Sequence, residues 1–225
     1  MKKTLTIVGI CLSMLGPGAV QAALTVNFDA GTTIETDQIT NFPATGATMG
    51  GMTVTAYSSG LAGGYETLSW AVTGPEAGRV SGSGWSLQMT GDTYDSTWTL
   101  TTTNICMDRL LLDGGPGNTV FDRYWEPFPG TSGSADGHTF EVTSDHSSLD
   151  ITATYVDLVA LSGQAPVGDL YGQLDVVFNS GLATGSTMTF IADTDNVSTV
   201  PAPGALMLVA MGTSLAGYLR RRKTL

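Results

Sequence analysis

Short segments with apolar residues at every second position, separated by turn-forming residues, constrain the fold of this chain more than any other feature. In residues 96–102, Trp98 and Leu100 recur at the two-residue period that places side chains on one face of a β-strand. About eleven segments of this kind follow one another. They cover residues 24–28, 52–57, 67–72, 85–89, 96–102, 105–112, 119–124, 139–142, 150–161, 170–178 and 187–191.

Helical periodicity competes with the strand pattern in one place, residues 155–161, where β-branched residues and the preceding alternation favour a strand. Strands connected by turns rather than helices are typical of antiparallel sheets packed face to face. We therefore expect an all-β fold, an antiparallel β-sandwich that is jelly-roll-like.

Both ends of the chain differ in composition from this body. Residues 1–22 have a basic start, an apolar stretch and the small-residue site Val20-Gln21-Ala22, which indicates an N-terminal signal peptide. We expect the β-sandwich over residues 23–192, a linker with a proline motif over 193–203, and a transmembrane helix with a basic tail over 204–225.

The C-terminal helix is predicted from 16 uncharged residues, 204–219, followed by Arg220, Arg221 and Arg222. At 1.5 Å per residue this run is about 24 Å long, and the flanking residues extend it toward the thickness of a bilayer core. The arginines hold that end on the cytoplasmic side. The segment is apolar all round, so packing on the domain as an amphipathic helix is the less favoured alternative.

Val200-Pro201-Ala202-Pro203, the single apolar helix and the arginine cluster together resemble the PEP-CTERM sorting signal, whose motif has Glu where this chain has Ala202. The resemblance implies an exported bacterial protein of the cell envelope or extracellular matrix. It also implies an exosortase, a sorting transpeptidase of the inner membrane, as partner. Cleavage near Val200–Pro203 would leave no membrane helix, whereas an uncut tail would anchor the protein permanently; both alternatives stay open.

The body of the chain is acidic, whereas its two ends are basic. Residues 23–199 contain three arginines, no lysine and all 20 carboxylates of the chain, a formal net charge of −17. Such a charge argues strongly against nucleic acid and anionic lipid surfaces as partners and favours cation binding or hydrated polysaccharide. The alternative is that the acidity serves solubility alone.

Two groups of residues are candidate binding sites. Tyr124, Trp125 and Glu126 form an aromatic and acidic segment that could contact glycans; the alternative is that its rings close one end of the sandwich.

Asp193, Asp195 and Asn196 offer the oxygen ligands that calcium prefers, and residues 113–118 offer a similar set. The alternative is that these Asp and Asn residues form turns. Calcium is the one cofactor that the sequence suggests.

No catalytic set stands out in the sequence. The chain has two histidines, His138 and His146, and no Gly-x-Ser-x-Gly motif. We therefore expect a non-catalytic structural or adhesive protein, associated with exopolysaccharide. The alternative is a secreted glycan-binding or glycan-degrading module.

Overall fold

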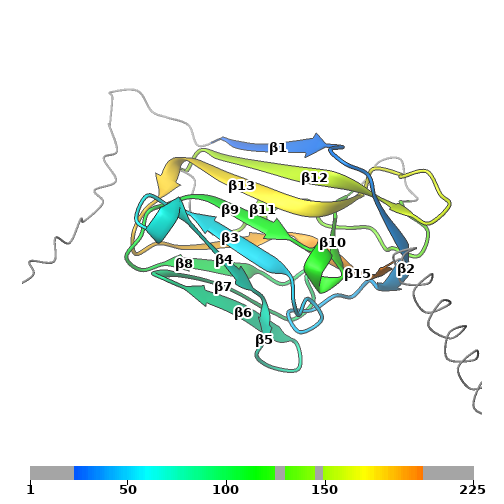
Figure 1. Ribbon diagram of the computed structural model, residues 1–225, viewed down its shortest axis with the longest axis horizontal. Coiled ribbons are helices and arrows are strands. Elements are labelled where there is room, and N and C mark those ends of the chain that lie inside the picture. Colours follow the sequence, from blue (N-terminus) through cyan, green and yellow to red (C-terminus); the bar gives the residue numbers. More distant parts are fainter. Residues whose placement is uncertain (1–22, 125–129, 145–148, 200–225) are drawn as a thin grey trace, which may run out of the picture.

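Two β-sheets hold nearly all the regular structure in the computed structural model, which describes residues 23–124, 130–144 and 149–199 (Figure 1). Two short 3₁₀ turns, η1 (Ala62–Gly64) and η2 (Gly115–Gly117), interrupt the strands, and these described ranges contain no α-helix. The expectation of an all-β fold is confirmed, and residues 155–161 lie in a strand.

The larger sheet has nine strands and the smaller has six. In spatial order the larger sheet contains β1 (Leu24–Asp29), β12 (Ile151–Leu161), β2 (Ile34–Asn41), β15 (Asp193–Thr199), β10 (Thr119–Asp122), β13 (Leu170–Leu182), β9 (Met107–Asp113), β3 (Thr53–Tyr57) and β4 (Tyr65–Ser69). The smaller sheet contains β11 (Glu141–Val142), β14 (Thr187–Ile191), β8 (Trp98–Thr102), β7 (Trp85–Thr90), β6 (Ala77–Gly82) and β5 (Ala71–Val72).

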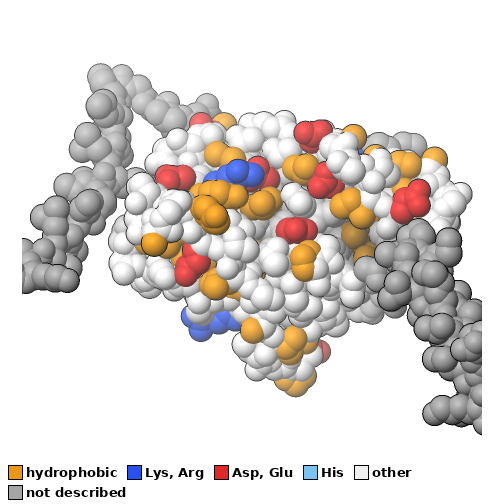
Figure 2. All heavy atoms as spheres, viewed as in Figure 1, with side chains coloured by type: hydrophobic (Ala, Val, Ile, Leu, Met, Phe, Trp, Pro, Cys, Tyr) orange, Lys and Arg blue, Asp and Glu red, His pale blue; other side chains and the backbone are white. Residues whose placement is uncertain are grey.

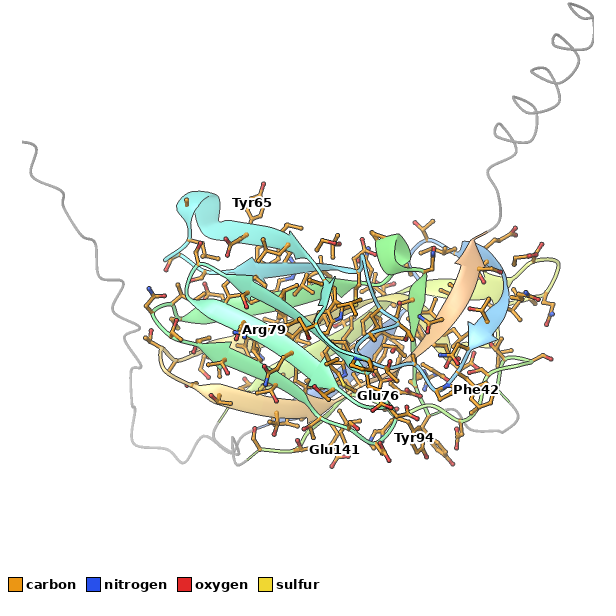
Figure 3. All side chains as sticks on the ribbon, turned by 90° about the horizontal axis from the view of Figure 1, so that it is seen from below. Phe42, Tyr65, Glu76, Arg79, Tyr94 and Glu141 are labelled. Carbon is orange, nitrogen blue, oxygen red and sulfur yellow. The ribbon has the colours of Figure 1, made fainter. Side chains whose placement is uncertain are left out.

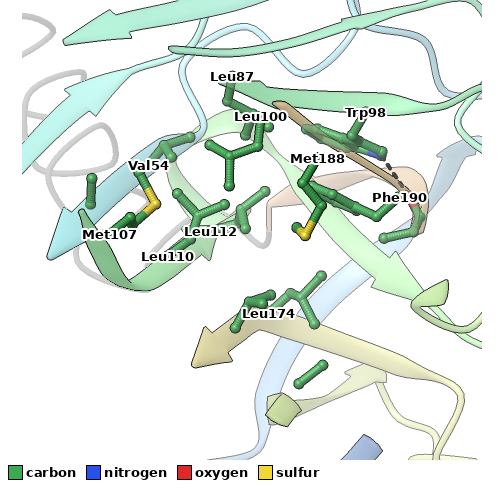
Figure 4. Close-up of a cluster of buried hydrophobic side chains, with 14 of the residues drawn as sticks. Val54, Leu87, Trp98, Leu100, Met107, Leu110, Leu112, Leu174, Met188 and Phe190 are labelled. Atoms are coloured by element: carbon green, nitrogen blue, oxygen red, sulfur yellow. Dashed lines mark hydrogen bonds between the residues drawn. The ribbon is translucent and has the colours of Figure 1, made fainter. Parts of the chain in front are cut away.

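The main hydrophobic core lies between the two sheets (Figure 4). Trp98 and Leu100 of β8 are fully buried on the same face, as their spacing predicts. The Trp98 ring stacks on Phe190 at a centroid distance of 5.9 Å, and its indole N–H donates to the Ala192 carbonyl at 3.0 Å. The described residues therefore form a β-sandwich-like fold.

The expectation of purely antiparallel pairing is wrong for β12, which pairs parallel with both β1 and β2. Strands β1 and β2 follow one another along β12, and residues 30–33 connect them. At this step Asp157 takes a positive φ of 63°, and its carboxylate accepts a hydrogen bond from the Thr32 N–H at 3.0 Å. This local break in β12 accommodates a connection that alternation alone does not reveal.

Five strands of the larger sheet close into a ring, because β12 pairs with β13, β13 with β10, β10 with β15, β15 with β2, and β2 again with β12 (Figure 1). A second apolar cluster belongs to this ring and is formed by Ile39, Val120, Val159, Leu170 and Val197. Residues 193–199, expected to belong to a polar linker, are β15, and this strand closes the ring. The correction matters because β15 carries all three predicted calcium ligands, Asp193, Asp195 and Asn196.

Among residues 23–124, 130–144 and 149–199, no helix has the length and hydropathy to cross a membrane. The predicted signal peptide, residues 1–22, and the predicted sorting helix, residues 204–225, lie outside the described residues.

The position of Leu100 generates a test of the core. Leu100→Ala should lower the free energy of unfolding by about 2–5 kcal/mol, because it leaves a cavity between the sheets. Thr99→Ala, on the opposite face of β8, should cost less than about 1 kcal/mol. Urea denaturation followed by tryptophan fluorescence measures both, and equal losses would contradict the assigned faces.

Candidate functional site

Strands β10 and β15 bring three aspartates together at one end of their ladder. Asp122 lies directly opposite Asp193 in the antiparallel register, and Asp195 follows two residues along β15. Alternation of side chains therefore places all three on one face, the face that also carries Val120 and Val197 of the ring. One carboxylate oxygen from each aspartate lies within 4.8 Å of the other two. We call these three residues the acidic cluster.

The acidic cluster is buried: Asp122 is 1 % exposed, Asp193 3 % and Asp195 1 %. Oδ1 of Asp193 accepts hydrogen bonds from the Thr93 hydroxyl at 2.8 Å and the Thr194 N–H at 2.7 Å. Oδ1 of Asp122, in contrast, has no hydrogen-bond partner among the described residues. A buried carboxylate oxygen without a partner is costly, so this atom requires a physical explanation.

The segment 130–137 covers the acidic cluster. The Ser134 hydroxyl contacts Oδ2 of Asp122 at 2.8 Å and also Oδ2 of Asp195. Gly137 packs so closely that a Cβ there would lie 2.5 Å from the Asp122 carboxyl carbon. The Asp122 carboxylate is thereby held between Ser134 and the backbone of Gly137.

Burial raises the pKa of all three carboxyl groups. Desolvation, then the neighbouring charge of Asp195, raises the pKa of Asp122 from 3.8 to about 9. Desolvation raises the pKa of Asp193 to about 8, although the Thr93 hydrogen bond opposes the rise. Desolvation raises the pKa of Asp195 to about 7, with contributions from the charges of Asp169 and Asp92. Without a cation, these groups keep protons at pH values where exposed aspartates are ionised.

A surface pocket of about 350 Å³ adjoins the acidic cluster, and Asp193 forms part of its lining. The other lining residues are Phe42, Pro43, Asp92, Tyr94, Ala135 and Asp136. Phe42 is 51 % exposed and Tyr94 47 % exposed, so both rings face solvent. Seen from below, Phe42 and Tyr94 lie on one side of the molecule, whereas the exposed Tyr65 lies at the other end (Figure 3). We call this the aromatic pocket.

A second depression shares Tyr94 with the aromatic pocket and also contains Tyr124, His138 and Glu141. Tyr124 is 49 % exposed, and its backbone N–H donates to the Thr139 hydroxyl at 3.2 Å. His138 lies 3.4 Å from the Glu141 carboxylate and packs edge-on against the Tyr94 ring. Tyr94 therefore joins two adjacent surfaces that both expose aromatic side chains.

The structure describes only some of the predicted site residues. Tyr124 lies in this aromatic surface, but its predicted partners Trp125 and Glu126 lie outside the described residues. The sorting residues Val200, Pro201, Ala202, Pro203, Arg220, Arg221 and Arg222 also lie outside them.

The three predicted calcium ligands do not lie on one face of β15. Asp193 and Asp195 lie together, whereas Asn196 is on the opposite face and donates to the Thr48 carbonyl at 3.0 Å. In the alternative loop, residues 113–118, Oδ1 of Asp113 accepts the Gly115 N–H and Asn118 takes a left-handed φ of 51°. These two residues act as turn formers there.

Sequence reasoning did not find Asp122 as a partner of Asp193 and Asp195. The predicted strand 119–124 extended two residues beyond the end of β10 at Asp122, and its pairing partner β15 was expected to be a linker. Phe42, Tyr94 and Ser134 lie in connecting segments without periodicity, so their convergence depends on the tertiary fold.

Few positive charges accompany these carboxylates. Among the described residues the ion pairs are Arg109–Asp175 and His138–Glu141, and neither reaches the acidic cluster. On the face shown in Figure 2, acidic side chains are scattered and basic ones are few.

No protein-family model matches this chain, and no curated protein or solved structure matches it.

The raised pKa values predict how the stability of the folded protein should change with pH. Because the folded state keeps protons on Asp122, Asp193 and Asp195 that the unfolded chain loses near pH 4, their contribution to stability is largest at low pH and declines as pH rises toward 9. We expect the melting temperature in chelator to fall between pH 5 and pH 9. Calorimetry measures it.

In Asp122→Asn the decline should be weaker, because one titrating group is gone. Asp108→Asn, an exposed change on β9, should keep the wild-type slope. A melting temperature that rises over this pH range would contradict the raised pKa values.

Proposed function

We propose that this chain is an exported bacterial protein of the cell envelope or extracellular matrix, whose non-catalytic β-sandwich adheres to polysaccharide. In this proposal the sandwich is jelly-roll-like, and a PEP-CTERM-like C-terminal signal delivers it to an inner-membrane sorting transpeptidase. The observation that carries the adhesive role is the aromatic pocket, in which exposed rings and carboxylates converge.

The aromatic pocket suits a sugar better than a flat protein partner. Phe42 and Tyr94 offer ring faces for the C–H surfaces of pyranose rings, and Asp92 and Asp136 offer acceptors for hydroxyl groups. Tyr124 continues the aromatic surface beyond Tyr94. An extended surface of this kind favours a polymer that contacts it over several sugar units.

The net negative charge of the body favours neutral polysaccharides over anionic ones as ligands. With three arginines against 20 carboxylates in residues 23–199, the domain repels polyanions. Neutral glycans carry no such cost. We therefore propose a neutral exopolysaccharide as the ligand.

The adhesive role predicts a selective loss of binding. Tyr94→Ala should weaken binding to a neutral polysaccharide at least about tenfold, because Tyr94 lines both depressions. Affinity electrophoresis against neutral and polyanionic polysaccharides, after a glycan array has selected the ligand, measures the change.

Tyr65→Ala is the matched control, since Tyr65 is 57 % exposed and lies at the other end of the molecule. Equal effects of the two substitutions, or no polysaccharide binding at all, would contradict the proposal. Release of soluble sugars during the assay would instead favour a glycan-degrading module.

The sorting proposal makes a separate prediction about the mature protein. Mass spectrometry of protein recovered from the cell envelope should find an N-terminus at Ala23 and, if the tail is processed, a C-terminus within Val200–Pro203. A C-terminus at Leu225 in a membrane fraction means a permanent anchor. Full-length protein in the cytoplasm, with residues 1–22 intact, would contradict export.

A further inference from the structure

We propose that Asp122, Asp193 and Asp195 bind one calcium ion between β10 and β15, with the Ser134 hydroxyl as a further oxygen ligand. This inference goes beyond the adhesive function and does not depend on it. It depends on the spacing of the three carboxylates and on the buried Asp122 oxygen that has no partner.

The spacing fits a single ion. Calcium binds oxygen ligands at about 2.3–2.6 Å, so ligands on opposite sides of one ion lie about 5 Å apart. The three carboxylate oxygens lie within 4.8 Å of one another and come from two adjacent strands. A cation among them would contact all three residues without a rearrangement of the ladder.

The unpartnered oxygen indicates that a positive group belongs here. Oδ1 of Asp122 is buried and accepts no hydrogen bond from the described residues. Gly137 packs against this carboxylate, since a Cβ there would lie 2.6 Å from Oδ1 itself, so the side chain has little room to change its orientation. A metal ion would give Oδ1 of Asp122 a partner that the described residues do not provide.

The contacts of Ser134 support the same conclusion. Its hydroxyl has one proton, yet it contacts Oδ2 of both Asp122 and Asp195. If both carboxylates are ionised, one of these contacts brings two electron-rich oxygens together. Either a bound proton or a bound cation removes this repulsion, and a cation lets all three aspartates ionise.

The chemistry of the ligands selects the class of ion. Carboxylate and hydroxyl oxygens suit hard cations, whereas zinc sites in proteins usually include imidazole or thiolate ligands. Asp169 is already satisfied by the Thr131 N–H and hydroxyl and by the Leu170 N–H, so it adds negative charge without competing as a ligand. Calcium tolerates irregular coordination completed by water, whereas magnesium demands a near-ideal octahedron.

Titration calorimetry and thermal unfolding of the purified, EDTA-treated protein test the site. We expect one calcium per chain and a melting temperature that rises by about 5 °C or more in excess CaCl₂, with a smaller response to MgCl₂. Asp195→Asn should weaken calcium binding at least about tenfold. Asp108→Asn, an exposed change on β9, should bind calcium as the wild type does.

Asp193→Asn is the second variant, because its amide oxygen can still accept the hydrogen bonds from Thr93 and Thr194 if Asp195→Asn fails to fold. Loss of the calcium response in either folded variant supports the site. No calcium binding by the wild type, an unchanged response in Asp193→Asn, or a response to magnesium without one to calcium would overturn it. Polysaccharide binding by Tyr94 variants is scored separately, so the two proposals fail independently.

Discussion

The burial of three carboxylates on the β10–β15 ladder is the constraint on which this architecture depends. Strand β15 closes the five-stranded ring, so its residues lose solvent on both faces. A polar strand can occupy that position only if its side chains find partners. Thr194 and Asn196 find them within the protein, through Thr93 and the Thr48 carbonyl. On the neighbouring strand, Oδ1 of Asp122 has no hydrogen-bond partner among the described residues.

The two faces of β15 explain why the sandwich and the ring form one structure. On the paired strand β10, two successive residues face different cores: Val120 belongs to the ring cluster and Phe121 to the main core. On β15, Val197 shares the ring face with the acidic cluster, while Thr194 and Asn196 face residues 48–49 and 93. The β10–β15 pair therefore contributes residues to the main core and to the ring cluster. A substitution in the acidic cluster should destabilise the packing of both.

Alternation made most strands predictable, but β2, β6 and β15 were not among the predicted segments. In residues 96–102 the large apolar side chains alternate with threonine, and the buried face follows directly from the sequence. Residues 193–199 carry one apolar side chain, Val197, so no hydrophobic pattern in the sequence indicates that this segment is buried. Its pairing is set by hydrogen bonds to strands far away in the chain. For the same reason the sequence identified two members of the acidic cluster and missed Asp122.

The aromatic pocket and the acidic cluster are physically connected through Asp193, which lines the pocket and belongs to the cluster. A cation bound by the acidic cluster would fix the position of segment 130–137 through its contact with Ser134. The same segment supplies Ala135 and Asp136 to the aromatic pocket. If the cluster binds a cation and the pocket binds polysaccharide, a cation that fixes this segment would also lower the entropic cost of polysaccharide binding. Reciprocity then requires that a bound polysaccharide strengthen cation binding by the same factor.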